Sequence, residues 1–377
     1  MRPTPRLFEI LVQALLLGLV AGGVLFALQT ARARMAAQGI PFSFAFLFQE
    51  AGFSLSEGVT YAPGEGFRPY HPGDAYWQAF LTGFLNTLRV ALAGLFLATF
   101  LGFAVGVGRL SQNPLVRGLA LLYVELIRNT PLLLQLFVWY FAVLLKLPPV
   151  EQALRLWGAW LSQRGLFLPW LEATPALPAF LALLALLGGV FWFGTRRGRL
   201  GARWRFGLLG LFALLALLLW PPFHLDLPAR TPFGVRGGLE ISPEFAALLF
   251  GLSVYTAAFI AEVVRGAILA VPKGQWEAAL ALGLTPRQVL RQVVLPQAVR
   301  IALPPLINQY LNLTKNSSLA VAVAYPDLFS VYNTVANQSG RALEGILIVM
   351  GVYLSISLTI SALVNAYNRK VVLRWGL

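Results

Sequence analysis

Long apolar stretches alternate with polar loops along the whole chain. A helix that crosses the ~30 Å hydrocarbon layer of a membrane needs ~20 mostly apolar residues. The stretches that approach this length are 8–28, 80–107, 118–145, 179–194, 206–222, 245–267, 301–324 and 343–366. Because the fourth is short and the fifth only just long enough, this pair forms either a tight hairpin or a re-entrant segment. The pattern predicts an all-α integral membrane protein, a polytopic helix bundle with about eight transmembrane helices.

The composition excludes most other classes of protein. Apolar residues make up 58% of the 377 residues and charged residues only 12%, whereas soluble domains carry about 25% charged residues. A soluble protein could not cover its surface with so few charges, and a disordered chain would be far less apolar. Cysteine is absent and the only histidines are His71 and His224, so thiolate chemistry is excluded and a histidine-rich metal site is disfavoured. We expect this chain to bind no metal and no cofactor.

The net charge of +14 bears on orientation in the lipid bilayer rather than on nucleic acid, and no nucleic-acid partner is expected. With the N-terminus placed in the cytoplasm, most Lys and Arg residues fall on cytoplasmic segments, especially 196–205 and 265–300, and most acids fall outside. Cytoplasmic loops carry such an excess, so both termini are predicted to be cytoplasmic. Segment 8–28 is a retained span or a signal peptide. Its apolar length exceeds the usual ~7–15 residues of a signal peptide, which favours a span.

Two long segments are predicted to lie outside the membrane. Segment 31–79 mixes aromatic residues with Gly and Pro and is too short for a core of its own. We expect it to be a loop that caps the bundle and contains an interfacial helix. Segment 148–178 is similar, and its Trp157, Trp160 and Trp170 belong to the residue type that gathers at membrane interfaces.

Motifs of catalysis are absent from the sequence. There is no Gly-Lys dipeptide, hence no Walker A phosphate loop, and no H-E-x-x-H, G-x-S-x-G or EF-hand pattern. The chain is predicted not to be an enzyme, and uphill transport would draw energy from an ion gradient or from another subunit. The firm carboxylates inside the predicted spans are Glu125 and Glu262. Proton-coupled carriers depend on buried acids, so this scarcity disfavours that class.

The loop between the sixth and seventh spans predicts two short helices at an angle. The first begins near Gly274 and ends at Gly283, a residue that suits the position after a helix C-terminus. Thr285 is a good N-cap for the second helix, and Gln288 completes a capping box. Pro296 disturbs the helix before the seventh span. The first helix contains small residues that let another surface approach closely. An ordinary solvated cytoplasmic loop is the alternative.

The same loop resembles the EAA loop of ABC importer permeases, whose pattern is E-A-A-x3-G-x9-I-x-L-P. Only Val293, in place of Ile, departs from it. The resemblance implies a coupling helix that sits in a cleft of a separate ATPase subunit, with Glu277 and Gly283 holding its geometry. The residues assigned to coupling are Gly274, Glu277, Ala278, Ala279, Gly283, Leu295 and Pro296.

Further segments resemble polar amino acid permeases of the histidine/glutamine type. Segment 128–135 is similar to their R-N-T-P-L-L-x-Q, segment 255–266 to the stretch before their coupling loop, and segment 315–319 to their K-x-S-S-L. The long loops resemble those of the larger general L-amino-acid permease subunits. The likeness implies a five-helix ABC importer core formed by the second, third, sixth, seventh and eighth spans.

This resemblance divides the chain into four parts. Residues 1–79 form an extra transmembrane helix and a periplasmic loop, and 80–145 the first part of the core. Residues 146–244 are an insertion with periplasmic loops and two extra helices. Residues 245–377 complete the core and contain the coupling loop 273–296.

Polar residues inside the predicted spans are candidates for a translocation path. A charge at the bilayer centre costs at least ~2.5–3.5 kcal/mol on insertion scales, so such residues face protein or water. The candidates are Asn86, Thr87, Arg128, Asn129, Thr130, Asn312, Lys315, Ser317 and Ser318. Lys315 would attract a substrate carboxylate.

A structural role for these residues is the alternative. Arg128 would then pair with Glu125, and the polar residues of the second and seventh spans would bond between helices. Pro131 frees a carbonyl near residue 127, and Asn129 and Thr130 would either satisfy it or help to line a cavity. Glu262 and Arg265 are expected to be a structural ion pair beside the coupling loop.

The function that the resemblance implies is that of the permease subunit of an ATP-driven ABC importer. It would move polar or general L-amino acids across the bacterial inner membrane by alternating access. The implied partners are two ATP-binding cassette subunits, which bind the ATP, a second permease, expected to form a heterodimer, and a periplasmic amino-acid-binding protein. The alternatives are a permease for another small polar solute such as an opine, an ion-coupled secondary carrier, and a membrane scaffold that transports nothing.

Overall fold

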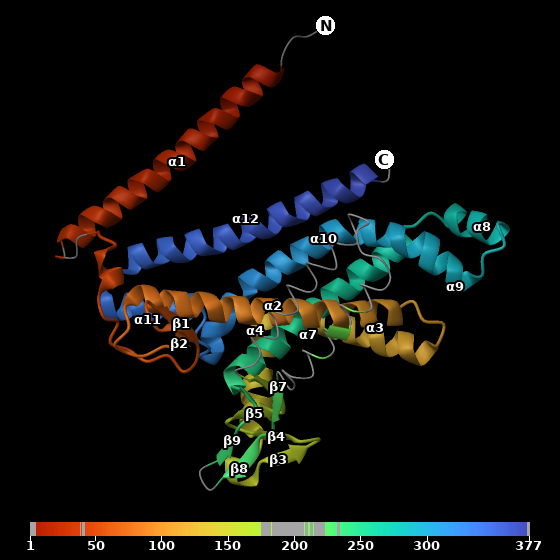
Figure 1. Cartoon of the computed structure of the whole chain (residues 1–377). Helices are drawn as coiled ribbons and strands as arrows, with labels where there is room; N and C mark the ends of the chain where they lie inside the picture. The colour runs from red at the N-terminus through yellow and green to blue at the C-terminus, as the bar shows by residue number, and fades with distance from the viewer. Residues whose placement is uncertain are drawn as a thin grey trace. The chain divides into compact units, whose positions relative to one another are not determined.

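A computed structural model describes residues 5–37, 42–174, 223–231 and 234–374, together with the single residues 39, 182, 207, 210, 211 and 214. The chain divides into two compact units. One comprises residues 1–137 and 248–377, and the other comprises residues 138–247. The first unit consists mainly of long helices, and the second carries short strands (Figure 1).

Among the residues that the structure describes, four helices are long and apolar enough to cross a membrane. They are α1 (Pro5–Ala37), α2 (Tyr76–Gly108), α7 (Pro243–Leu269) and α12 (Ala342–Arg374). The count rises to six if each of two bent helix pairs forms one span. The predicted spans 179–194 and 206–222 lie outside the described residues. A helical, multi-span architecture is therefore confirmed, and the predicted total of about eight stays a prediction.

The predicted span 118–145 is not one continuous helix. It consists of α3 (Pro114–Arg128), α4 (Leu132–Phe137), the π-helical η2 (Val138–Val143) and the 3₁₀-helical η3 (Leu144–Lys146). The two halves meet at an angle of 105°. Pro131 lies in the break and has no N–H to continue the ladder of helical hydrogen bonds, which is the physical reason for the bend.

The predicted span 301–324 also departs from a single α-helix. The helix α10 (Leu295–Asn316) continues into the 3₁₀-helical η6 (Ser317–Val323), and α11 (Leu328–Ser339) follows. The axis bends by 50° between η6 and α11. Ala324, at the end of η6, has a φ of 58° and turns the chain.

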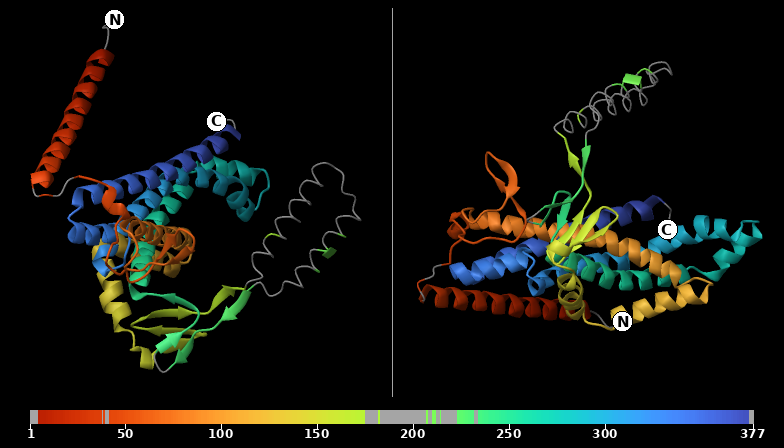
Figure 2. Two further views of the ribbon diagram at one scale, coloured as in Figure 1. Left: turned by 60° about the vertical axis from the view of Figure 1, so that its left-hand side comes forward. Right: turned by 90° about the horizontal axis from the view of Figure 1, so that it is seen from below.

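The segments predicted as outer loops contain strands, which adds a β component to the helical bundle. In the first unit, β1 (Val59–Ala62) pairs with β2 (Gly66–Pro69), and the 3₁₀-helical η1 (Ala45–Phe48) stands where an interfacial helix was expected. The second unit has an antiparallel sheet in the order β10-β5-β4-β3 and the pairs β6–β7 and β8–β9 (Figure 2).

The strands of the second unit are short. Their bounds are β3 Leu154–Leu156, β4 Ala159–Ser162, β5 Gly165–Leu168, β6 Trp170–Ala173, β7 Phe223–Asp226, β8 Ala229–Thr231, β9 Gly234–Arg236 and β10 Leu239–Ile241, after the 3₁₀-helical η4 Val150–Gln152. Trp157 and Gly158 join β3 to β4 with φ values of 49° and 87°. Such two-residue turns match the twist of paired strands. Trp157 itself is 94% exposed.

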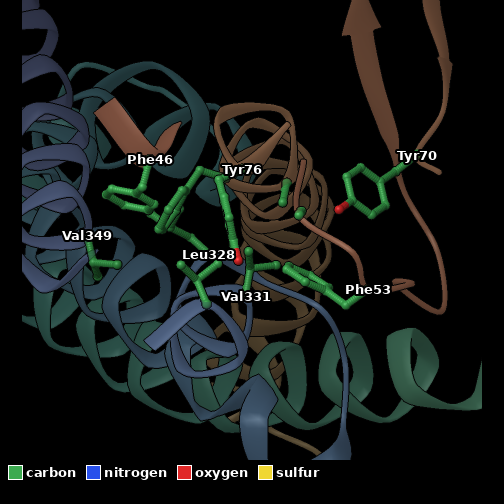
Figure 3. Close-up of a cluster of buried hydrophobic side chains, with 11 residues drawn as sticks. Phe46, Phe53, Tyr70, Tyr76, Leu328, Val331 and Val349 are labelled. Atoms are coloured by element: carbon green, nitrogen blue, oxygen red, sulfur yellow. The ribbon is translucent and has the colours of Figure 1, made fainter. Parts of the chain in front are cut away.

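The outer segment of the first unit shares a hydrophobic core with the helices. Phe46, Phe53 and Tyr76 are buried against Leu328 and Val331 of α11, and Val349 of α12 belongs to the same cluster (Figure 3). This agrees with the expectation of a loop that caps the bundle and has no separate core.

An ion pair between Arg68 and Asp74 stabilises the outer segment 42–75, here called the cap. The carboxylate of Asp74 accepts hydrogen bonds from both terminal nitrogens of the Arg68 guanidinium, at 2.6 and 3.0 Å. The hydrogen bond from Arg68 lowers the pKa of the Asp74 carboxyl below its usual value. The backbone N–H of Ala51 donates to the carbonyl of Asp74 at 2.8 Å, which ties the ends of the cap together.

The helices α2 and α7 approach each other closely because two glycines of α2 lie at the contact between them. A Cβ added to Gly102 would lie 2.6 Å from Cβ of Ile260 and 2.9 Å from the carbonyl oxygen of Ala257. A Cβ on Gly106 would lie 2.7 Å from the carbonyl oxygen of Ala261. Small residues at such contacts let membrane helices pack at close range.

We predict that Gly102→Ala destabilises the helical unit by about 1–3 kcal/mol, because the added methyl group has no space and the helices must separate. The matched control is Gly266→Ala, a helical glycine of α7 with open space around its Cβ position. Thermal unfolding of the purified protein in detergent measures both. Equal unfolding temperatures for the two variants would contradict the close α2–α7 contact.

Candidate functional site

The predicted coupling loop folds as two short helices. The first is α8 (Lys273–Ala281), and the second is α9 (Pro286–Gln288), followed by the π-helical η5 (Val289–Val294) and α10. Gly283 lies between the helices with a φ of 82°, a backbone conformation in which residues other than glycine are strained. Oε1 of Gln288 accepts a hydrogen bond from the backbone N–H of Thr285 at 2.8 Å, which begins the second helix as the sequence predicts.

One face of α8 is anchored and another is open. Ala279 is 4% exposed, and Nε2 of Gln297 in α10 donates to Oε1 of Gln275 at 3.2 Å. The side chains of Glu277 and Ala278 are exposed, and that of Leu282 is 83% exposed. The loop lies at the end of the helical unit opposite to the cap segment 42–75 (Figures 1 and 2). An apolar side chain in this position is suited to contact with a partner.

A row of polar side chains runs along α10. Asn308, Asn312 and Lys315 are exposed and occupy helical spacing that places them on one face. Within the described ranges, none of the three takes part in a hydrogen bond or an ion pair with another side chain. Contact with lipid would leave these groups unsatisfied at a high cost. The face must therefore meet protein or water, as a translocation path would require.

The two serines that follow Lys315 have local partners. Oγ of Ser317 is buried, donates to the carbonyl of Thr314 at 2.8 Å and lies 3.5 Å from the hydroxyl of Tyr353 in α12. Oγ of Ser318 donates to the carbonyl of Lys315 at 2.8 Å. The two bonds to carbonyls are local to the α10–η6 junction, and the contact with Tyr353 connects this junction to α12. The structure thus separates the two serines, which have partners, from the open face of Asn312 and Lys315.

Asn86 and Thr87 attach α2 to the turn before α11. Nδ2 of Asn86 donates to the carbonyls of Glu57 and Pro326 at 3.1 and 2.9 Å. Oγ1 of Thr87 accepts from the backbone N–H of Leu328 at 3.1 Å. Both side chains are buried. Of the two roles that the sequence leaves open for them, these contacts match bonding between segments, and a role in the path stays a prediction.

Gln135 stabilises the break between α3 and α4. Its Nε2 donates to the carbonyl of Ile127 at 2.9 Å and to that of Thr130 at 3.1 Å. The backbone N–H of Thr130 also donates to the carbonyl of Ile127, at 3.4 Å, and so does that of Asn129. The expectation that Asn129 and Thr130 would satisfy this carbonyl is therefore confirmed for their backbone and not for their side chains. Gln135 reaches back across the bend, whereas Oγ1 of Thr130 donates to Leu126 at 2.7 Å. The signal for this role was Gln135 itself, the last residue of the R-N-T-P-L-L-x-Q segment.

The predicted pair of Glu125 and Arg128 does not form. The Arg128 guanidinium lies over the ring of Phe259 in α7, 5.2 Å from its centroid, and the Glu125 carboxylate accepts from Nδ2 of Asn129 at 3.4 Å. Arg128 is the last residue of α3, so its side chain is free to turn toward α7 instead of along its own helix. Both Arg128 and Asn129 remain exposed.

The pair of Glu262 and Arg265 is confirmed, with a nitrogen–oxygen distance of 2.5 Å. Its third member was not predicted. Arg109, at the end of α2, also binds the Glu262 carboxylate. The three charges join α2 to α7 close to the start of the coupling loop. Within the part of the chain that the structure describes, no group of three His, Asp or Glu side chains is arranged to hold a metal ion.

This chain is similar to known proteins over most of its length. The family described as "Binding-protein-dependent transport system inner membrane component" matches residues 94–373. The putative amino-acid ABC transporter permease protein YhdX of Escherichia coli (strain K12) is 44% identical over 98% of this chain and 95% of its own length. The general L-amino acid transport system permease protein AapQ of Rhizobium johnstonii is 40% identical over 98% of this chain and 93% of its own length.

One further relative and one solved structure are similar to this chain. The glutamate/glutamine/aspartate/asparagine transport system permease protein BztB of Rhodobacter capsulatus is 40% identical over 98% of this chain and 95% of its own length. The solved structure described as "Crystal structure of an amino acid ABC transporter with histidines" covers 78% of this chain and 95% of its own, at 22% identity and a TM-score of 0.49.

Substitution of two asparagines tests whether Asn86 stabilises the fold and whether Asn312 does not. Asn86→Leu removes the donor to the Glu57 carbonyl and the donor of the buried contact with the Pro326 carbonyl. A buried group left unsatisfied costs about 1–3 kcal/mol, so we predict a clearly lower unfolding temperature in detergent. Asn312→Leu removes an exposed side chain that has no partner among the described residues, and we predict no loss of stability. The assignment of these contacts would be wrong if the two variants unfolded alike.

Proposed function

The chain belongs to the family of binding-protein-dependent transport system inner membrane components, and we propose that it is the permease subunit of an ATP-driven importer of polar or general L-amino acids. It is a permease component of an amino-acid ABC importer, a transport subunit of the inner membrane. Hydrolysis of ATP belongs to separate ATP-binding cassette subunits, and the chain itself needs no cofactor.

The observation that carries this proposal is the open face of α8. Glu277 and Ala278 are exposed beside Leu282, whose side chain is 83% exposed. Gly283 sets the angle between α8 and α9 through its positive φ. A rigid helix with small and apolar side chains on its open face has the form of an element that inserts into a partner. We assign that partner as one of two ATPase subunits.

Movement of α8 would reach the spans through both of its ends. Pro272 joins α8 to the end of α7, and the contacts of α8 with η5 lead into α10. Closure of the ATPase subunits on ATP would shift α8 and, with it, the helix that carries Asn312 and Lys315. Such coupling of a partner's motion to two arrangements of the spans is alternating access.

The open polar face of α10 supports a second permease subunit as a partner. Because this face cannot be left against lipid, we propose that it borders a path at the interface with that subunit. Lys315 would attract the carboxylate of an amino acid there. We retain a heterodimer as the proposed form.

The cap supports docking of a periplasmic amino-acid-binding protein on the outer side. The cap segment 42–75 and the coupling loop 273–296 lie at opposite ends of the helical unit (Figure 1). With both termini in the cytoplasm, the cap faces the periplasm and the coupling loop faces the ATPase subunits. The excess of arginine on the segments assigned to the cytoplasm supports this orientation.

The complex itself tests the proposal. Purification of the detergent-solubilised protein from its own cells should recover an ATPase, a second permease and ATP hydrolysis stimulated by a loaded amino-acid-binding protein. Mass spectrometry identifies the subunits in the eluate, and an ATPase assay measures the stimulation of ATP hydrolysis. Recovery of the chain alone, under conditions that preserve a control ABC complex, would favour the ion-coupled carrier instead.

Substitutions in the coupling helix α8 should lower amino-acid transport and leave membrane insertion unchanged. Glu277→Lys reverses a charge on the docking face, and we predict that amino-acid uptake falls about tenfold or more, the factor that ~1.4 kcal/mol of lost docking energy gives. Membrane insertion stays normal because Glu277 is exposed. Uptake into proteoliposomes and co-purification of the ATPase measure the effect.

The matched control is Glu151→Lys, the same charge reversal on an exposed residue of the second unit. Gly283→Val should behave as Glu277→Lys does, because a β-branched residue is strained at a φ of 82°. Normal uptake by both coupling variants would contradict the assignment of α8.

Lys315 should contribute to substrate transport and not to the stability of the fold. We predict that Lys315→Met lowers amino-acid uptake about tenfold to a hundredfold, as expected for the loss of a charged hydrogen-bond donor worth ~1.5–3 kcal/mol. The unfolding temperature and the binding of the ATPase should not change. Uptake equal to that of the unmodified protein would remove Lys315 from the path.

A further inference from the structure

A pocket of about 410 Å³ lies between the end of α2, the start of α3 and the end of α7. Three arginines from these three elements, Arg109, Arg117 and Arg265, line it. The pocket is at the end of the helical unit that also carries the coupling loop, where the α2–α3 turn is seen in Figures 1 and 2.

The charges of this pocket are not balanced within the described residues. Glu262 pairs with both Arg109 and Arg265, so one carboxylate serves two guanidinium groups. Arg117 is exposed, and the part of the chain that the structure describes contains no ion-pair or hydrogen-bond partner for its side chain. Three positive charges therefore face one negative charge. An anion in the pocket would relieve their mutual repulsion and use the free N–H donors.

We propose that this pocket binds the phosphate of an anionic phospholipid in the inner leaflet of the membrane. The planar guanidinium groups match the oxygens of a phosphate, and basic pockets between membrane helices on the cytoplasmic side suit anionic headgroups. The location in the inner leaflet rests on the orientation given under the proposed function, whereas the binding of a phosphate rests on the pocket alone.

The apolar surface of α3 favours a lipid over free phosphate. Leu121 lines the pocket together with the arginines. Leu115, Leu119 and Leu122 form a row on α3, and their side chains are 68%, 59% and 63% exposed. A phosphate held by the arginines would thus have an apolar row beside it along which acyl chains can lie. A free phosphate ion would gain nothing from this row.

The site has a direct connection to the coupling loop. Arg265 and Glu262 belong to α7, whose end at Leu269 leads through Pro272 into α8. A phosphate bound to Arg109 and Arg265 would share these guanidinium groups with Glu262. The lipid would therefore strengthen the attachment of α2 to α7 next to the element that is assigned to the ATPase.

The proposal is tested by lipid binding to the purified full-length protein. Native mass spectrometry compares the retention of phosphatidylglycerol with that of phosphatidylcholine. For Arg117→Gln we expect about fivefold weaker retention of phosphatidylglycerol, the factor that the loss of one surface arginine near an anionic lipid gives. Because Arg117 is exposed, this variant should fold normally.

The matched control is Arg291→Gln, which removes the same charge from an exposed arginine of η5 outside the pocket, and it should retain phosphatidylglycerol as the unmodified protein does. Arg117→Glu should weaken retention further. Retention of phosphatidylglycerol that is unchanged by both Arg117 substitutions would overturn the proposal.

Competition with inorganic phosphate identifies the source of the anion. Millimolar inorganic phosphate that leaves phosphatidylglycerol bound supports the lipid site. Displacement by inorganic phosphate, with equal retention of phosphatidylglycerol and phosphatidylcholine, would assign the pocket to a free anion and overturn the lipid. None of these measurements uses transport, so their outcome is independent of the proposed substrate and ATPase.

Discussion

Hydrocarbon offers no hydrogen bonds, and this constraint organises the helical unit. Every polar group placed in the membrane must find a partner in protein or water. Gln135 satisfies the carbonyl of Ile127 that Pro131 frees, and Asn86 holds the carbonyls of Glu57 and Pro326. The breaks in α3–α4 and α10–α11 are therefore stable bends that specific side chains complete.

The same constraint makes the remaining open polar groups informative. Asn312 and Lys315 are exposed on α10 and lack a partner among the described residues, whereas neighbouring Ser317 is buried and bonded. A membrane protein can maintain such a face only against protein or water. This is the physical basis for assigning the α10 face to a path shared with a second subunit, and the exposed α8 face to a partner outside the membrane.

Patterns of short range were readable from the sequence, whereas contacts between distant segments were not. The caps and the glycine of the coupling loop follow local rules, so α8 and α9 lie where they were predicted. The loop sequence around Trp157 and Gly158 predicted tryptophans at an interface and missed the hairpin of β3 and β4. The preference of a segment for a strand depends on its neighbours in the sheet, and this sheet is completed by β10, which comes from far along the chain to pair with β5. Likewise, Arg128 turns to Phe259 in α7, although spacing along its own helix favoured Glu125.

The order of the residues was sufficient to show that the chain crosses a membrane, which segments form most of its helices, and to which family of transport proteins it belongs. Hydropathy and motif spacing carry that information, because each acts within a single segment. Three features became visible only in the folded chain: α2 and α7 touch at Gly102, Arg109 joins the Glu262–Arg265 pair, and three arginines surround one pocket. Those features arise only when helices from distant parts of the chain pack together, and their charges and volumes then have to be compatible.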